Sequence, residues 1–212
     1  MARDNDQRRR GRGPTAPSRD RERGGAALLI IDMVNSFDFP GADRMKPKAE
    51  AICASILKLR AAADAAGVPV IYVNDNFGEW HSNQSLIVAH ARKEGGEIVK
   101  RIAPAKNHYF VVKPQFSGFY ATNLPILLPK LGASRLIITG ISTDICVLFT
   151  AADAHMRDYA VWIPSDAVAA QSDERGRQAL AIARDSMGAQ TAPTDKLNLG
   201  EWLARLDKEG TR

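Results

Sequence analysis

Apolar runs without alternation are the feature that most constrains how this sequence can fold. The runs are rich in Val, Ile and Leu and do not place a polar residue at every second position. Strands that are buried on both faces have this pattern, whereas half-buried strands alternate. The four clearest runs are AALLIID (26–32), VPVIYVND (68–75), YFVVK (109–113) and SRLIITGI (134–141).

Helical patterns separate these runs. Ala, Ile and Leu recur at helical spacing over 46–66, where GVP at 67–69 ends the pattern. The other expected helices cover 81–93, 123–132, 144–158, 172–187 and 196–206. A fifth strand is expected over 160–166 and a short sixth near 189–192. Strands that alternate with helices predict an α/β fold: a three-layer α/β/α, doubly wound sheet of about six mostly parallel strands.

The N-terminal segment differs in composition from the rest of the chain. Residues 1–24 contain eight Arg and four acidic residues, so they carry +4 of the net charge of +5. They hold too few apolar residues to offset the entropy of ordering, and we expect a disordered tail over 1–24 and a single domain over 25–212. Weak polyanion binding by the tail is the alternative, but a nucleic-acid partner is not expected.

Cellular location is indicated only indirectly. No apolar run approaches the ~18 residues needed to cross a bilayer, so no membrane partner is expected. The run after the Arg cluster, AALLII, is too short for a signal peptide and stops at Asp32. With two cysteines and no secretory signal, the chain fits a reduced cytoplasm.

Polar side chains at the ends of the expected strands are the candidates for function, because ligands of such sheets bind outside the carboxyl ends of the strands. Asp32 ends the first run and Lys113 the third, and we expect both to lie outside the core. Cys146, in GISTDIC (140–146), falls in the first turn of the following helix. Each residue alone has an ordinary explanation: Asp32 could cap a turn, Lys113 could be solvated, and Cys146 could simply pack in the core.

Together, the acid, the amine and the thiol are the set that a cysteine nucleophile requires. A helix N-terminus and Lys113 would lower the pKa of the Cys146 thiol. Asp32 can take the thiol proton and return it to a leaving amine. Cys53, in contrast, lies on an apolar helix face and is expected in the core.

Three motifs, in order, resemble the isochorismatase-like cysteine hydrolases over about residues 25–190. They are LLIIDMVNSF, VKPQFSGFYATNL and LIITGISTDICVLFTAADAHMRDYAV. That family includes nicotinamidases, N-carbamoylsarcosine amidase, ureidoacrylate hydrolase and biuret hydrolase. The resemblance implies a catalytic triad of Asp32, Lys113 and Cys146. It also implies a cis peptide between Ile141 and Ser142 that directs the Ser142 N–H, with that of Cys146, at an oxyanion, and a homo-oligomer, dimer or tetramer.

Two departures from the family patterns narrow the chemistry. Nicotinamidases carry an Asp-x-His metal motif after the second strand, where this chain reads Asp75-Asn76-Phe77. No metal and no other cofactor is therefore expected. The isochorismate-cleaving members act on a vinyl ether and some lack the cysteine, so its presence here favours amide chemistry. A third departure is Ser36, which stands where many relatives have an acid.

The expected function is a metal-independent amidohydrolase that cleaves a C–N bond of a small-molecule amide through a thioester on Cys146. Two alternatives stay open: vinyl-ether hydrolysis with Asp32 as the acid, and a non-catalytic binding scaffold. The expected substrate-binding residues lie near the active edge by position and indicate an apolar or flat substrate. They are Phe37, Asn74, Asn76, Trp80, Gln115, Phe116, Phe119, Tyr120 and Ile145.

Overall fold

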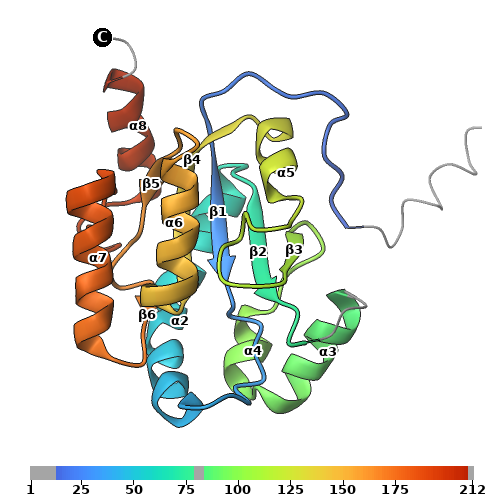
Figure 1. Cartoon of the computed structure of the whole chain (residues 1–212). Coiled ribbons are helices and arrows are strands. Elements are labelled where there is room, and N and C mark those ends of the chain that lie inside the picture. Colours follow the sequence, from blue (N-terminus) through green and yellow to red (C-terminus); the bar gives the residue numbers. More distant parts are fainter. Residues whose placement is uncertain (1–12, 79–83, 210–212) are drawn as a thin grey trace, which may run out of the picture.

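The computed structural model describes residues 13–78 and 84–209 of the chain. Its centre is a six-stranded sheet in which every pairing is parallel. The predicted α/β/α sandwich is confirmed (Figure 1). The strands are β1 (Gly25–Ile31), β2 (Val70–Asp75), β3 (Tyr109–Lys113), β4 (Ala133–Ile141), β5 (Ala160–Trp162) and β6 (Val168–Ala169).

The strand order creates a crevice in the middle of the sheet. The order is β3-β2-β1-β4-β5, with β6 also paired to β4. The chain therefore winds outward in one direction from β1 and in the other from β4. At such a switch point the connections leave to opposite faces and open a crevice at the carboxyl ends of the strands.

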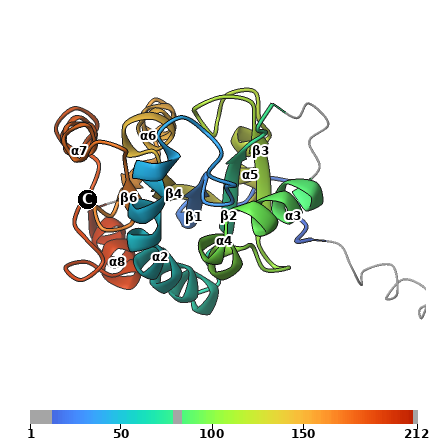
Figure 2. The same ribbon diagram turned by 90° about the horizontal axis from the view of Figure 1, so that it is seen from below.

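Helices cover both faces of the sheet (Figure 2). One apolar core joins the sheet to residues of α2 (Ala42–Ala65), α3 (Gln84–Glu94), α4 (Glu97–Ile102) and α8 (Leu199–Glu209). The other joins it to residues of α5 (Leu124–Lys130), α6 (Leu148–His155) and α7 (Asp173–Met187). Successive residues of β1 enter the two cores in turn, as expected of a strand buried on both faces. In the part of the chain that the structure describes, no helix is long and apolar enough to cross a membrane.

The sixth strand was predicted in the wrong place. It lies at Val168–Ala169, whereas Gln190 makes only an isolated bridge to Trp162. Pro164, which has no N–H to donate to a ladder, follows β5 closely and begins a turn closed by the Ala167 amide. The chain then returns to β4 beside Gly140. The short helix α4 was not predicted, because six residues after a Gly-Gly pair show little periodicity.

Part of the N-terminal segment lies against the body of the protein. Residues 13–24 form no helix or strand, but the Arg21 amide donates to the Pro129 carbonyl (3.1 Å). Lys130 Nζ donates to the Ser18 carbonyl, and Tyr109 Oη donates to that of Thr15. Residues 1–12 lie outside the described residues, and the domain boundary at Gly24 stays a prediction.

Candidate active site

The acid, the amine and the thiol predicted from strand ends meet at the switch point. Lys113 Nζ lies 2.9 Å from Asp32 Oδ2 and 3.6 Å from Cys146 Sγ. Asp32 also acts electrostatically on Cys146, because its negative charge raises the pKa of the thiol. Lys113 therefore lies beside both of the other groups, although the three come from separate segments of the chain.

Two strands fix the positions of Asp32 and Lys113. Asp32 is the first residue after β1 and has a φ of 52°, a left-handed conformation that Asp tolerates better than most residues. Its Oδ1 accepts a hydrogen bond from the Asp75 amide at the end of β2 (2.8 Å). Lys113 ends β3, on the far side of β2, and its long side chain spans that strand to reach Asp32.

The prediction that both residues lie outside the core is wrong. Lys113 is fully buried and Asp32 is 6% exposed. Their burial is possible because the charges are compensated: Asp75 Oδ2 adds a second carboxylate 3.4 Å from Lys113 Nζ. The sequence analysis considered Asp75 only as part of an absent metal motif and missed its place beside the amine.

Cys146 lies on a π-helical turn, Thr143–Val147, that precedes α6. The Ser142 carbonyl accepts from the amides of Ile145 and Val147, and the Cys146 carbonyl accepts from Thr150 Oγ1. The peptide bond between Ile141 and Ser142 is cis. The Ser142 backbone lowers the pKa of the Cys146 thiol, against the effect of burial.

Burial dominates the ionisation of this cluster. It raises the pKa of Cys146 to about 12, with a further contribution from the Asp32 charge, and Lys113 only partly opposes it. The expectation of a lowered thiol pKa is therefore wrong for the resting protein. Burial also raises the pKa of the Asp32 carboxyl, against the influence of Lys113. Burial disfavours the Lys113 ammonium, but Asp32, Cys146 and Asp75 outweigh this and raise its pKa.

A cavity of about 350 Å³ opens beside the cluster. Most of the side chains around it are apolar or belong to the group of polar residues around Cys146. Gln171, in the loop before α7, adds an amide donor, and Arg175, at the start of α7, adds a guanidinium donor. Arg175 Nη2 lies 2.8 Å from Asp144 Oδ2, yet the Arg175 side chain is 62% exposed. The lining residues are Asp32, Asn35, Phe39, Met45, Asp75, Phe77, Ile141, Ser142, Asp144, Ile145, Cys146, Gln171 and Arg175.

Among the predicted substrate-binding residues, Ile145 lies on the cavity wall. Phe37, Asn74 and Phe119 do not, because they are buried in structural roles. The Asn74 side chain, for example, bonds both the amide and the carbonyl of Val34 and so fixes the loop after β1.

The other predicted pocket residues are also not brought to this wall. Asn76 is buried and accepts a hydrogen bond from the Gly78 amide. Phe116 is exposed and packs against Phe149, with ring centroids 5.6 Å apart. Gln115 and Tyr120 are exposed, and Trp80 lies outside the described residues.

Residues that the sequence analysis missed include Asn35, Asp144, Gln171 and Arg175. Arg175 lies on α7 and gives no local signal of a site, because a single Arg on a helix is ordinarily solvated. Its position beside Cys146 follows only from the packing of α7 against the π-helical turn. Within the described residues, no group of three His, Cys, Asp or Glu side chains is arranged to hold a metal ion.

The fold and the cluster together define a three-layer α/β protein whose polar centre lies at the switch point of a parallel sheet. The family model described as the isochorismatase domain matches residues 26–195. An uncharacterized isochorismatase family protein of Bacillus subtilis, YaaI, is 40% identical over 81% of this chain and 95% of its own length. The chain belongs to the isochorismatase family.

Amidases are among the relatives and the structural neighbours. The N-carbamoylsarcosine amidase of Arthrobacter is 29% identical over 67% of this chain, which spans 58% of that protein. The crystal structure of N-carbamoylsarcosine amidase from Thermoplasma acidophilum has a TM-score of 0.64 and 30% identity. The match covers 82% of this chain and 99% of that one. The family is thus one of hydrolases that includes enzymes acting on amide C–N bonds.

Proposed function

We propose that this protein is a cysteine amidohydrolase that cleaves a C–N bond of a small amide through a thioester on Cys146. The observation that carries the proposal is the contact of Lys113 with both Asp32 and Cys146, which line one cavity. Residues that only cap a turn or carry a solvated charge do not need to lie this close together. A cysteine nucleophile, its base and a cation that holds the base in place do need this arrangement.

The raised pKa values assign the proton steps. The thiol is protonated at rest, so Asp32 takes its proton as Sγ attacks the carbonyl carbon. A buried carboxylate is a stronger base than a solvated one, which suits this step. Asp32 then protonates the leaving nitrogen, the C–N bond breaks and the thioester remains.

Water completes the cycle. It attacks the thioester carbonyl and gives a proton to Asp32. The C–S bond breaks, the carboxylic acid leaves, and the proton on Asp32 returns to the sulfur. Throughout, the Lys113 ammonium keeps Asp32 oriented and compensates the negative charge. The backbone N–H groups of Ser142 and Cys146 stabilise the oxyanion of each tetrahedral intermediate.

A panel of small amides with ammonia and amine detection tests the proposal. Turnover should disappear in Cys146→Ala and after thiol alkylation, and it should persist in Cys53→Ala, the matched control. A chelator should leave turnover unchanged, because the Asp-x-His pattern is absent at 75–77. Vinyl-ether hydrolysis that survives alkylation would support the alternative enzyme class, and binding without turnover would support a scaffold.

We also propose that the chain works as a homo-oligomer in the cytoplasm, with one hydrolase domain over 25–212. Arg175 forms one wall of the cavity beside Cys146, and its side chain is exposed, so the cavity is open to solvent on this side. A neighbouring subunit would complete such a wall.

A further inference from the structure

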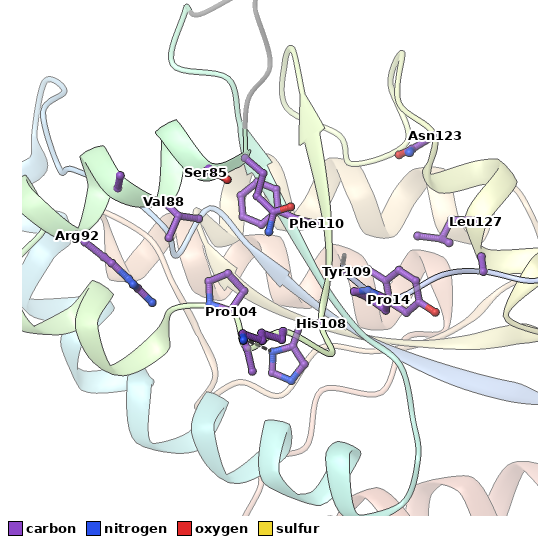
Figure 3. A pocket seen from close by; sticks show the side chains of 16 residues that line it. Pro14, Ser85, Val88, Arg92, Pro104, His108, Tyr109, Phe110, Asn123 and Leu127 are labelled. Atoms are coloured by element: carbon purple, nitrogen blue, oxygen red, sulfur yellow. Dashed lines mark hydrogen bonds between the residues drawn. The ribbon is translucent and has the colours of Figure 1, made fainter. Parts of the chain in front are cut away.

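A second and larger hollow, of about 680 Å³, lies at the open edge of the sheet. It surrounds β3, the edge strand, between α3 and α5, and shares no residue with the cavity beside Cys146 (Figure 3). The lining residues are Gly13, Pro14, Ala16, Gln84, Ser85, Val88, Ala89, Arg92, Pro104, Ala105, Lys106, His108, Tyr109, Phe110, Asn123 and Leu127.

The hollow has flat apolar surfaces on both sides of β3. Successive side chains of a strand point to opposite faces. Phe110 therefore faces Val88 and Pro104 on the α3 side, and Tyr109 faces Pro14 on the α5 side (Figure 3). Aromatic rings and prolines that are only partly buried offer stacking surface to a flat ligand.

The charged side chains that line the hollow are positive. Among the residues that the structure describes, its lining includes no Asp or Glu, but it includes Arg92 and Lys106, both exposed. Within residues 13–78 and 84–209, no acidic partner is recorded for either cation. The neighbouring Lys93, in contrast, pairs with Glu94 (3.0 Å) and does not line the hollow. His108 is already satisfied, because Nδ1 accepts from the Ala105 amide and Nε2 contacts Asp64.

We infer that this hollow binds an organic phosphate of nucleotide size, with the phosphate at Arg92 and Lys106 and a flat group against Phe110. Two cations for which the described residues supply no carboxylate partner match a dianion, and the volume lies in the range of small-molecule sites. The aromatic and proline surfaces supply the remaining contact. The inference does not depend on the role of Cys146.

Calorimetric titration of the full-length protein with AMP and with adenosine, at low ionic strength, tests the inference. The two probes differ only in the phosphate. AMP should bind once per chain and at least about tenfold more tightly than adenosine, since only AMP can accept charge-assisted hydrogen bonds through a phosphate. AMP should also bind protein whose Cys146 is alkylated, which excludes the other cavity.

Variants identify the site. Arg92→Gln and Lys106→Gln should each weaken AMP binding by about tenfold, while Lys93→Gln, on the same helix, should leave it unchanged. All three should retain wild-type circular dichroism. Equal affinity for AMP and adenosine, no binding at millimolar AMP, or equal losses in Arg92→Gln and Lys93→Gln would each overturn the inference. The last result would reduce it to non-specific attraction of anions to a basic chain.

Discussion

Asp32 favours the charged form of one partner and the neutral form of the other. Its negative charge favours the Lys113 ammonium but disfavours the Cys146 thiolate. The same carboxylate that is proposed to remove the thiol proton therefore keeps the resting thiol protonated. A substitution of Asp32 should therefore change the reactivity of the Cys146 thiol and the rate of turnover in opposite directions.

Asp32→Asn should make Cys146 more reactive toward iodoacetamide at pH 8 while turnover falls by about 10²–10⁴. The substitution removes a charge that raises the pKa of the thiol, and it removes the proposed base. Peptide mapping of the alkylated protein measures the first effect and the amide assay the second. Slower alkylation together with normal turnover would contradict the assignment.

The pH dependence of alkylation tests the raised thiol pKa in the wild-type protein. Because the pKa of Cys146 is about 12, its rate of labelling should still rise between pH 9 and pH 10, where a solvated thiol with a pKa near ~8.5 approaches a plateau. Glutathione under the same conditions is the control. A plateau of Cys146 labelling below pH 8 would show a preformed thiolate.

Lys113→Met should destabilise the protein by about 3 kcal/mol or more, because it leaves two buried or half-buried carboxylates without their cation. Urea unfolding measures this. The double variant with Asp32→Asn should recover part of the loss, since one uncompensated charge is removed as well. Additive losses would show that the two side chains do not interact.

Three residues of the site could be predicted because each follows a strand, and the strand ends of a parallel sheet share one edge. The positions that the Asp75, Arg175 and Asn74 side chains take could not be predicted in the same way. Asn74 and Asp75 are consecutive at one strand end, yet one holds a loop from inside and the other faces Lys113. Only the register and twist of the sheet decide which side chain reaches the cavity.

At the scale of elements, β4 is constrained most tightly at its end. Gly140 has a φ of 108° and pairs with both β1 and β6. A Cβ atom there would lie 2.0 Å from the Ile31 carbonyl oxygen, a backbone atom that cannot move aside. Glycine is required because the two strands approach closely just before the segment that leads to Cys146.

Gly140→Ala should therefore strongly lower the melting temperature or prevent folding. Gly200→Ala, in α8, is the matched control: a Cβ there would meet only the Asn198 side chain at 3.5 Å. It should be neutral or stabilise the protein by up to about 1 kcal/mol. Thermal unfolding of both purified variants gives the comparison, and a Gly140→Ala protein as stable as wild type would refute the argument.

Long elements could be predicted better than short ones. The runs that form β1 to β4 and the long helix α2 have enough residues to show their period. The two residues of β6 and the six of α4 do not, and their positions depend on what β4 and the core leave uncovered. The turn at Pro164 lies inside the strand expected over 160–166, which ends at Trp162, and this turn determines the position of β6.

At the scale of the whole molecule, the three-layer architecture followed from the apolar runs because strands buried on both faces are typical of a parallel sheet covered by helices. The assembly state did not follow from them. The 66% exposed Leu86 on α3 is a feature that a neighbouring subunit could cover.

Light scattering on full-length protein and on a chain beginning at Gly24 should give the same subunit number, two or more. The N-terminal segment contacts α5 and β3 of its own chain, and the residues before Gly24 carry few apolar side chains that could bind a neighbour. A monomer of ~23 kDa for the full chain would contradict the prediction, as would dissociation caused by the truncation alone.

The reach of Lys113 across β2 has a consequence for how the chain would acquire the proposed activity. The three groups come from β1, β3 and the turn after β4, and each parallel pairing that brings them together joins distant parts of the chain. Such a topology has a high contact order and folds slowly. An intermediate lacking any one of these strands would leave Cys146 without a base or without a cation. The thiol would thus gain its proposed catalytic environment only in the last stage of refolding, and a nascent chain would carry an ordinary solvated cysteine, without base or cation, until the sheet is complete.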